Sequence, residues 1–310
     1  SHALAMNKLA GVALDAAIFT NLSRDHLDFH HTFEDYFNAK KKLFTDIRQK
    51  RGYAGFVNAD DPYGIRLQTE VGGLHGFGVK NGETRAWSVS LLAIGSTFEV
   101  RSPHSSPFPV HTSLLGEHNL YNVLGVVAVA LHLGIAPEAI QQGIEAVRLI
   151  PGRMEPVDAG QDFTVIVDYA HTPDSLLKIL ASTRRFAKGQ VLCVFGCGGD
   201  RDTGKRAKMG RIAAELADRV FITSDNPRSE QPESILCHIL AGVPLHCAAK
   251  IQLTADRRAA IQAAVQAARP GDAVVIAGKG HETYQILKDK TIPFDDREEA
   301  RKALAVGGAG

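Results

Sequence analysis

The sequence VLCVFGCGGDRDTGKRAKMGRIAAELADRVFITSDNPRSE, which runs from Val191 to Glu230, decides the fold class of this chain. It begins with an apolar run that ends in a glycine-rich loop, continues as a helix, and closes with a second apolar run and a polar loop. This order predicts a strand–helix–strand unit with a charged loop at the carboxyl end of each strand. Parallel strands share that edge, where open α/β sheets bind ligands, so we expect Arg201 and Arg228 to face the same crevice.

Two further apolar runs in this half of the chain also end in polar loops. The run at 165–167 leads into DYAHTP at 168–173, and the run at 273–276 leads into AGKGHE at 277–282. Between and after these strands the apolar periodicity predicts helices at 173–186, 205–217, 232–241 and 254–268. The second half of the chain therefore reads as an α/β domain with a mostly parallel sheet, and four strand ends deliver polar side chains to one rim.

The composition is typical of a soluble globular protein, with 45% hydrophobic and 22% charged residues among 310. The length predicts two domains, and because Ile150-Pro151-Gly152 breaks the helical pattern, we place them at 1–150 and 151–310. A net charge of +1 gives no field that would attract nucleic acid or an anionic membrane. The most apolar stretch, 123–136, is shorter than the roughly 20 residues that a membrane span requires. We expect neither nucleic-acid nor membrane partners.

Two features favour a reducing, cytoplasmic location. The first residues, Ser-His-Ala-Leu, lack the basic and apolar regions of a signal peptide. The cysteines lack zinc-type spacing, and we expect them to stay reduced and to pack as small core hydrophobes. They are Cys193, Cys197, Cys237 and Cys247.

The first half of the chain carries a polar stretch of its own. An apolar strand at 16–20 leads into NLSRDHLDFHH at 21–31, which is either a ligand site or a solvated loop whose Thr32 caps the next helix. That helix is predicted over 33–50, and its three consecutive lysines would ordinarily form a solvated face. Further predicted elements are a strand at 53–58, a short helix after the turn at 58–62, antiparallel strands over 74–109, and helices at 117–132 and 137–148.

The glycine-rich loop at 196–201 invites a dinucleotide interpretation. The third glycine of that fingerprint is replaced by Arg201, whose side chain would crowd the helix–strand packing, so we disfavour a nicotinamide oxidoreductase. An arginine fork donates two parallel hydrogen bonds to a carboxylate. Two such forks, Arg201 and Arg228, together with the negative charge of Glu282 would suit a small zwitterion. An amino acid is the natural candidate ligand.

Six motifs, in the same order along the chain, resemble those of the Mur ligase family. They are TNLSRDHLD at 20–28, GEHN at 116–119, GRME at 152–155, DYAHTP at 168–173, DNPR at 225–228 and GKGHE at 278–282. The resemblance covers essentially the whole chain, and six motifs in register are highly specific. Within the family, the chain is most similar to the ligases that add diaminopimelate.

The resemblance implies that residues 1–150 are the central ATP-binding domain and residues 151–310 a Rossmann-like, amino-acid-binding domain. It implies a cytoplasmic, ATP-dependent ligase of peptidoglycan synthesis, and so a role in cell-wall biogenesis, cell shape and cell division. ATP would phosphorylate the D-glutamate carboxylate of UDP-N-acetylmuramoyl-L-alanyl-D-glutamate, and the amine of meso-diaminopimelate would then attack the acyl phosphate. Mg²⁺ is the implied cofactor, ATP the co-substrate, and a monomer the expected state.

The resemblance also assigns residues to each ligand. The implied diaminopimelate site consists of Arg201, Asp225, Asn226, Pro227, Arg228, Gly278 and Glu282. Arg228 would decide selectivity, because lysine lacks the second carboxylate that its fork would hold. The implied nucleotide contacts are His118, Asn119, Arg153, Asp168 and His171. The implied contacts to the muramyl dipeptide are Ser1 and Lys8.

Lys40 matches the carbamylated lysine of the family, and His26 matches a magnesium ligand. A plain ammonium repels a cation, whereas a carbamate offers the oxygen ligands that Mg²⁺ takes. With this resemblance we expect a functional role for Lys40 and keep Lys41 and Lys42 as a solvated face.

Some family features are absent from the 310 residues. No G-x-x-x-x-G-K-[ST] occurs, although the family holds the β- and γ-phosphates with such a loop. Met6 and Lys8 stand where the family usually has Gln and Arg. We therefore expect a truncated ligase in which Lys40 is mostly the free amine. Two hypotheses follow: the amide ligase as the parent activity, or a catalytically inactive fragment that only binds the amino acid.

Overall fold

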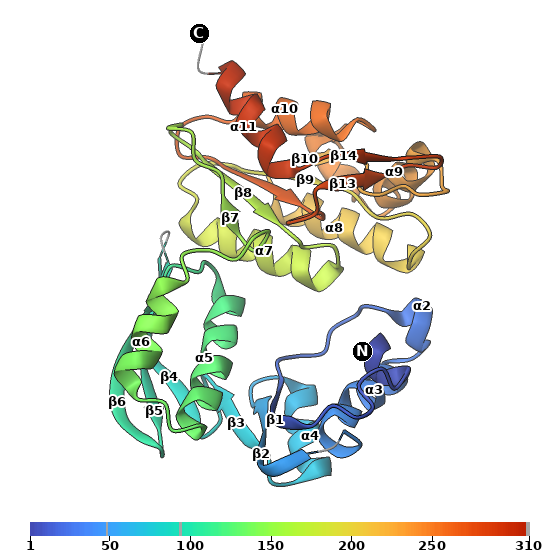
Figure 1. Cartoon of the computed structure of the whole chain (residues 1–310). Helices are drawn as coiled ribbons and strands as arrows, with labels where there is room; N and C mark the ends of the chain where they lie inside the picture. Colours follow the sequence, from blue (N-terminus) through green and yellow to red (C-terminus); the bar gives the residue numbers. More distant parts are fainter. Residues whose placement is uncertain (48, 93–94, 308–310) are drawn as a thin grey trace. The chain divides into compact units, whose positions relative to one another are not determined.

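The computed structural model describes residues 1–47, 49–92 and 95–307. They form two compact units that divide between Arg148 and Leu149. In the part of the chain that is described, each unit is built on its own six-stranded sheet, and the C-terminal unit has a small hairpin in addition (Figure 1).

The sheet of the N-terminal unit has the strand order β1-β2-β3-β4-β5-β6. β1 to β4 pair in parallel, whereas β4, β5 and β6 form an antiparallel meander. The antiparallel strands predicted over 74–109 are therefore confirmed for β4 to β6, but the prediction is wrong for β3, which pairs in parallel with both β2 and β4. The strands are Leu14–Phe19 (β1), Gln49–Asn58 (β2), His75–Gly78 (β3), Thr84–Leu92 (β4), Gly95–Ser102 (β5) and Ser105–Thr112 (β6).

The helices of this unit lie against that sheet and around its first strands. α5 packs against β2, β3 and β4 and buries Leu120, Leu124 and Val127 in the core. The helices are His2–Ala5 (α1), Leu27–His30 (α2), Phe33–Thr45 (α3), Pro62–Val71 (α4), Glu117–His132 (α5) and Pro137–Ala146 (α6).

The helix predicted over 33–50 is correct at its start and wrong at its end. Thr32 Oγ1 accepts the N–H of Asp35 at 3.0 Å, which confirms the predicted cap. At the other end α3 stops at Thr45, and Gln49 already belongs to β2. The apolar spacing continues the helical period past Thr45, but pairing with β1 takes the last residues into the sheet.

The main sheet of the C-terminal unit has the strand order β11-β10-β9-β12-β8-β7. All neighbours pair in parallel except β7 and β8, which confirms the α/β fold with a mostly parallel sheet. The strands are Glu155–Pro156 (β7), Thr164–Asp168 (β8), Val191–Phe195 (β9), Arg219–Ile222 (β10), Ile251–Leu253 (β11) and Ala273–Ala277 (β12), with Tyr284–Ile286 (β13) and Thr291–Pro293 (β14) forming the hairpin.

Helices cover both faces of this sheet, α10 and α11 on one and α7 and α8 on the other (Figure 1). The predicted helices agree with the structure to within three residues at each end. The helices of this unit are Pro173–Phe186 (α7), Arg206–Leu216 (α8), Pro232–Leu240 (α9), Arg257–Ala267 (α10) and Asp296–Gly307 (α11), with the short 3₁₀ helices Thr203–Lys205 (η1) and Leu245–Lys250 (η2).

The cysteines do not all pack as core residues. Cys193, Cys197 and Cys247 are buried and free, as predicted, but Cys237 is exposed on α9. The prediction fails for Cys237 because α9 turns Ile235, Leu236 and Ile239 towards the core, and Cys237 lies on the opposite, outer face of the helix. Among the described residues, no helix combines the length and the apolar character that a bilayer span needs.

Candidate functional site

Three polar loops of the C-terminal unit meet at one edge of its sheet. β9 pairs in parallel with β10 on one side and with β12 on the other, so the loops that follow these strands leave the sheet at the same end. We call residues 198–201, 225–228 and 278–282 the strand-end cluster. The backbone N–H of Gly199 donates to the carbonyl of Asn226 at 2.9 Å, which joins the first two loops directly.

Glycine allows this close approach. A Cβ placed on Gly199 would lie 1.9 Å from the carbonyl oxygen of Pro227, well inside van der Waals contact. A Cβ on Gly278, where φ is +121°, would lie 2.6 Å from Oδ2 of Asp225. The glycines therefore let the first and third loops approach the middle loop more closely than a residue with a Cβ could at these two positions.

The side chain of Arg201, which ends the first loop of the cluster, and the side chain of Arg228 from the middle loop both lie near Gly198. A Cβ on Gly198 would lie 2.9 Å from Nη1 of Arg228 and 3.8 Å from Cγ of Arg201. Nη1 of Arg228 donates to the carbonyl of Gly199 at 2.7 Å, and Nη1 of Arg201 donates to the carbonyl of Asp200 at 3.1 Å. The structure therefore brings the two arginines together, as the shared sheet edge predicted.

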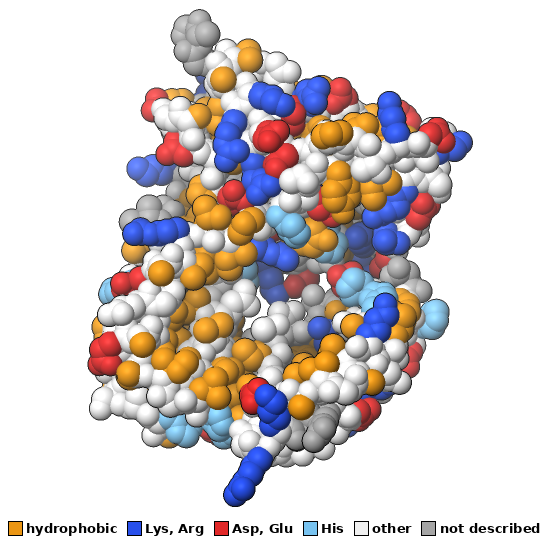
Figure 2. All heavy atoms as spheres, viewed as in Figure 1, with side chains coloured by type: hydrophobic (Ala, Val, Ile, Leu, Met, Phe, Trp, Pro, Cys, Tyr) orange, Lys and Arg blue, Asp and Glu red, His pale blue; other side chains and the backbone are white. Residues whose placement is uncertain are grey.

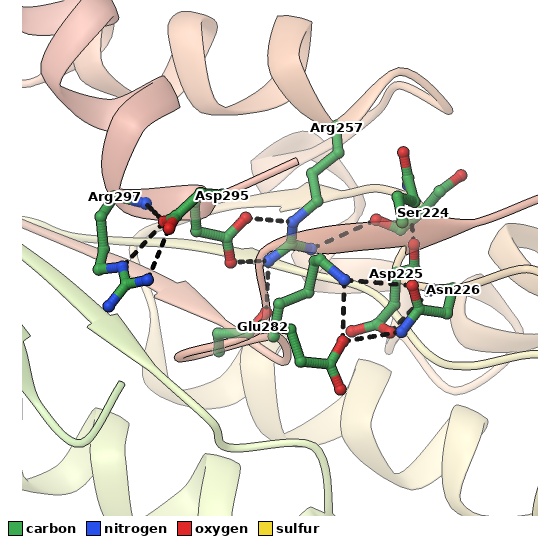
Figure 3. A network of polar contacts seen from close by, with 11 residues as sticks. Ser224, Asp225, Asn226, Arg257, Glu282, Asp295 and Arg297 are labelled. Carbon is green, nitrogen blue, oxygen red and sulfur yellow. Dashed lines mark hydrogen bonds and ion pairs between the residues drawn. The ribbon is translucent and has the colours of Figure 1, made fainter. Parts of the chain in front are cut away.

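The other side of the cluster is a hydrogen-bonded group of Asn226, Lys279 and Glu282 (Figure 3). The Nδ2 atom of Asn226 donates to Oε2 of Glu282 at 2.9 Å. The buried Nζ of Lys279 donates to that same oxygen at 2.9 Å and to Oδ1 of Asn226 at 3.1 Å. Oδ1 also accepts the N–H of Ile286 at 3.0 Å, which fixes the orientation of the amide. Oε1 of Glu282 has no hydrogen-bond partner among the described residues, so it can accept from a ligand.

Asp225 and Pro227 shape the middle loop. The carboxylate of Asp225 is buried and accepts the N–H of Asn226 at 2.7 Å. The carbonyl of Asp225 accepts from Nε2 of Gln285 at 2.7 Å, and the N–H of Arg228 donates to the carbonyl of Ile286 at 3.1 Å. The hairpin strand β13 therefore holds this loop at both of its ends.

A second polar group follows β8 and precedes β7 in the same unit. Asp168 is buried, and its Oδ2 accepts the N–H of Met154 at 2.7 Å. Burial raises the pKa of Asp168 above its usual range, against the opposing effects of that hydrogen bond and of the charge on Arg153. The exposed guanidinium of Arg153 lies 4.9 Å from the ring centroid of Tyr169, and the ring of His171 packs 4.6 Å from the same centroid. This group combines an exposed cation and an aromatic surface with a buried carboxyl group.

In the N-terminal unit, Lys40 and His26 both lie near the ring of Tyr36. Nζ of Lys40 is 5.2 Å from the ring centroid, and the imidazole centroid of His26 is 6.1 Å from it. Burial lowers the pKa of Lys40, and the carboxylates of Asp25 and Asp61 only partly oppose this effect. Burial also raises the pKa of Tyr36 to about 12. Lys40 is thus set apart from Lys41, which forms an ion pair with Glu70 at 2.7 Å.

Histidine rings surround this corner of the unit, in the part of Figure 2 that corresponds to α2 and the N-terminus in Figure 1. The ring of His2 lies 4.8 Å from that of His26 and 5.6 Å from that of His30, and Nε2 of His30 is 2.9 Å from Oγ of Ser1. Within the described ranges, no three His, Cys, Asp or Glu side chains already stand in a metal-binding arrangement. Lys8 is exposed.

The remaining nucleotide candidates stand at the start of α5. His118 is half-buried, and Asn119 is almost completely buried. Nδ2 of Asn119 donates to the carbonyl of Leu115 at 2.8 Å, and Oδ1 accepts from Asn122 at 3.2 Å. The amide of Asn119 therefore fastens the start of the helix in this structure.

Sequence reasoning missed several residues that build the site. Lys279 was noticed only as part of a motif, and Tyr169 only as a neighbour of His171. The buried arginines Arg206 and Arg257 gave no signal, because a charged residue at the start of an amphipathic helix is usually exposed. One pattern could have pointed to Lys279: it stands between two glycines, Gly278 and Gly280, directly after a fully apolar strand.

Comparison with known proteins gives matches along most of the chain. Residues 1–130 match the Mur ligase middle domain, and residues 152–280 match the glutamate ligase domain of Mur ligases. UDP-N-acetylmuramoyl-L-alanyl-D-glutamate–2,6-diaminopimelate ligases of Thermosynechococcus vestitus and Syntrophomonas wolfei are 48% and 43% identical over 98% of the chain. The chain spans 61% and 62% of the length of these two relatives.

Solved structures agree with these matches. A structure of a UDP-N-acetylmuramoyl-L-alanyl-D-glutamate–2,6-diaminopimelate ligase is 33% identical, with a TM-score of 0.63 over the whole chain and 64% of its own length. The MurF ligase of Thermotoga maritima in complex with ADP shares the fold, with a TM-score of 0.72 at 16% identity over 98% of this chain and 64% of its own. Two family domains in their proper order, with relatives this similar along the same residues, establish that the chain belongs to the Mur ligase family.

Proposed function

We propose that the protein is an ATP-dependent amide ligase that joins meso-diaminopimelate to UDP-N-acetylmuramoyl-L-alanyl-D-glutamate in peptidoglycan synthesis. The relatives that are named for this activity support the proposal, and they are longer than this chain. ATP transfers its γ-phosphoryl group to the D-glutamate carboxylate, with ADP as the leaving group. The amine of diaminopimelate then attacks the acyl carbon, phosphate leaves with the C–O bond, and the nitrogen loses a proton as the amide forms.

The observation that carries the proposal is the charge arrangement of the strand-end cluster. Two arginines meet at Gly198, and the Glu282 carboxylate lies across the middle loop, held by Asn226 and Lys279. One end of diaminopimelate carries a carboxylate and an ammonium on the same carbon. We propose that Arg228 and Arg201 take the carboxylate, that Glu282, which Asn226 holds in place, takes the ammonium, and that Asp225, Pro227 and Gly278 shape the loops around them.

The proposed nucleotide contacts are His118, Asn119, Arg153, Asp168 and His171. The exposed guanidinium of Arg153 suits a phosphate, and the rings of Tyr169 and His171 suit stacking with a base. Asp168 suits a ribose hydroxyl. Ser1 and Lys8 are the proposed contacts to the muramyl dipeptide, for which the resemblance is the support.

We also propose that Lys40 is the residue that the parent ligase carbamylates, and that the carbamate would hold Mg²⁺ together with His26, whereas in these 310 residues Lys40 is mostly the free amine. Both residues lie beside Tyr36, and burial of Lys40 favours an uncharged amine, the form that reacts with carbon dioxide. The carbamate and the imidazole would supply an oxygen and a nitrogen ligand, and bound Mg²⁺ would neutralise phosphate charge. NMR with ¹³C-bicarbonate should show only a weak carbamate signal from these 310 residues, which Mg²⁺ strengthens and Lys40→Arg abolishes. Lys41→Arg is the matched control, and a signal that persists in Lys40→Arg contradicts the assignment.

The proposed function is tested by binding, because the 310 residues contain no G-x-x-x-x-G-K-[ST] motif. Calorimetry should show that meso-diaminopimelate binds more tightly than lysine, which lacks the second carboxylate, and than pimelate, which lacks both amines. Glu282→Gln should weaken diaminopimelate and leave pimelate nearly unchanged. Equal affinities for the three compounds, or no heat from diaminopimelate with a folded protein, would contradict the proposal.

A further inference from the structure

Behind the strand-end cluster, Arg257 and Asp296 form an ion pair in which both side chains are completely buried. Nε of Arg257 donates to Oδ1 and Nη2 to Oδ2 of Asp296, each at 2.7 Å. Arg257 is the first residue of α10 and Asp296 the first residue of α11. Removing two charges from water costs several kcal/mol per ion, so such a pair is weak evidence of added stability and calls for another role.

The remaining hydrogen bonds of Arg257 go to the residues that directly precede two loops of the strand-end cluster. Nη1 donates to the carbonyl of Ser224 at 3.3 Å, and Nη2 donates to the carbonyl of Ala277 at 3.0 Å (Figure 3). These carbonyls belong to the residues immediately before Asp225 and Gly278. One guanidinium therefore holds the starting points of two of the three loops.

The strand order explains why this bridge matters. β10 and β12 do not pair with each other, because β9 lies between them. The sheet therefore relates the loop after β10 to the loop after β12 through β9, without a ladder that joins these two strands directly. Arg257 spans β9 and ties both loops to a single rigid group, and the contact of Asn226 with Glu282 depends on that distance.

The charges near Arg257 are consistent with this role. Burial opposes its positive charge, but Asp296, and then Asp225 and Glu282, outweigh burial and raise the pKa of Arg257. Two of these carboxylates belong to the cluster itself. The guanidinium thus also stabilises negative charge on the side that faces the ligand.

We propose that the Arg257–Asp296 pair is a positioning element for amino-acid recognition: it sets the separation of the loops at 225–228 and 278–282 so that Asn226 holds Glu282 where it meets the ligand ammonium. This inference rests on the proposed function for the identity of the ligand. The positioning itself is a property of the unliganded protein and can be measured without a ligand.

The test replaces both charges at once, in Arg257→Met/Asp296→Leu. Exchanging a complete buried pair for apolar residues is often neutral for stability, whereas removing one partner leaves an unpaired buried charge. The double variant should therefore melt close to the parent. Amide hydrogen exchange at Ile286, whose N–H donates to Asn226, should accelerate by about tenfold or more. The dissociation constant for meso-diaminopimelate should rise roughly tenfold.

The matched control is Arg258→Gln/Glu299→Gln. This neighbouring pair joins the same two helices, with Nε and Oε2 2.7 Å apart, but it does not contact Ser224 or Ala277. The control should keep parental exchange at Ile286 and parental affinity. An equal loss in the control would reduce the role of Arg257 to helix packing and overturn the inference.

Parental exchange and parental affinity in the folded Arg257→Met/Asp296→Leu variant also overturn it. If that variant does not fold, Arg257→Lys decides, because an ammonium keeps the charge but cannot reach both carbonyls while it holds both carboxylate oxygens. Faster exchange at Ile286 in Arg257→Lys supports the inference, and unchanged exchange refutes it. A parent that fails to bind diaminopimelate contradicts only the proposed function, since the exchange measurement needs no ligand.

Discussion

Arg206 is completely buried, and its two terminal nitrogens donate to the two carboxylate oxygens of Glu230 at 2.8 and 2.7 Å. Nη2 of Arg206 also donates to the carbonyl of Gly198 at 3.2 Å, and Glu230 accepts the N–H of Asp200 at 2.7 Å. The pair therefore joins the loop that carries Arg201 to the loop that carries Arg228.

This pair predicts a pH dependence of stability. The hydrogen bonds from Arg206 lower the pKa of Glu230 from 4.5 to about 2. A lowered pKa in the folded state means that the stabilisation is complete above pH 4.5 and is lost as the pH falls towards 2. Urea unfolding should show Glu230→Gln less stable than the parent at pH 7, with the difference shrinking below pH 4.5. A difference that stays constant across this range would show that the charge of Glu230 is irrelevant.

Arg228→Ala should remove most of the preference for meso-diaminopimelate over lysine. Nη1 of Arg228 is used by the carbonyl of Gly199, but its Nε and Nη2 have no partner among the described residues and can hold a carboxylate. Losing this charge-assisted contact should cost about 1.5 to 3 kcal/mol for diaminopimelate and little for lysine. Calorimetry with both amino acids measures the ratio. Arg211→Ala, an exposed arginine on α8, is the control that should leave it unchanged.

Gly199→Ala should damage the strand-end cluster even though it adds only one methyl group. The added Cβ would lie 1.9 Å from the carbonyl oxygen of Pro227, so one of the two loops must move. We expect a loss of about 1 to 3 kcal/mol in the free energy of unfolding, together with weaker diaminopimelate binding. Gly143→Ala on α6, where a Cβ meets nothing within 4 Å, should instead be neutral or stabilising. Similar effects of the two substitutions would show that the close contact at Gly199 carries no energy.

Thiol labelling should find one fast-reacting cysteine in the native protein. Cys237 is exposed, whereas burial raises the pKa of Cys193 and of Cys197 to about 12, and Cys247 is buried as well. Thiolate is the reactive form, so the three buried thiols should react only on unfolding. Ellman's reagent should therefore titrate one thiol in the native protein and four in denaturant, and Cys237→Ser should abolish the fast reaction. A second fast thiol would contradict the burial of Cys193, Cys197 or Cys247.

The elements predicted best were those whose patterns are local. The apolar run that opens the stretch 191–230 coincides with β9, and the helix predicted at 173–186 is α7 at both ends, because buried strands and helix periodicity are set by nearby residues. The end of α3 was wrong because pairing with β1, a contact from another part of the chain, overrides the helical period.

The candidate site divides in the same way. That Arg201 and Arg228 reach one loop could be predicted, because parallel strands share an edge. The contacts of Arg257 could not be, because its partners Asp296, Ser224 and Ala277 are distant in the sequence and nothing near Arg257 distinguishes it from an exposed arginine. Likewise, burial of Lys279 is a property of the three loops together rather than of its own neighbours.

The position of β12 between β9 and β8 also affects how the C-terminal unit is made on the ribosome. A nascent chain that has reached residue 272 can pair β9, β10 and β11, but it still lacks the strand that joins β9 to β8. β12, in the late segment at 273–296, must then insert between β8 and β9. Pairings between segments that are distant in the sequence form slowly, and until they form the unpaired strand edges are exposed to aggregation. Because this segment also carries Gly278, Glu282 and Asp296, the proposed amino-acid site is complete only after β12 has taken its place in the sheet.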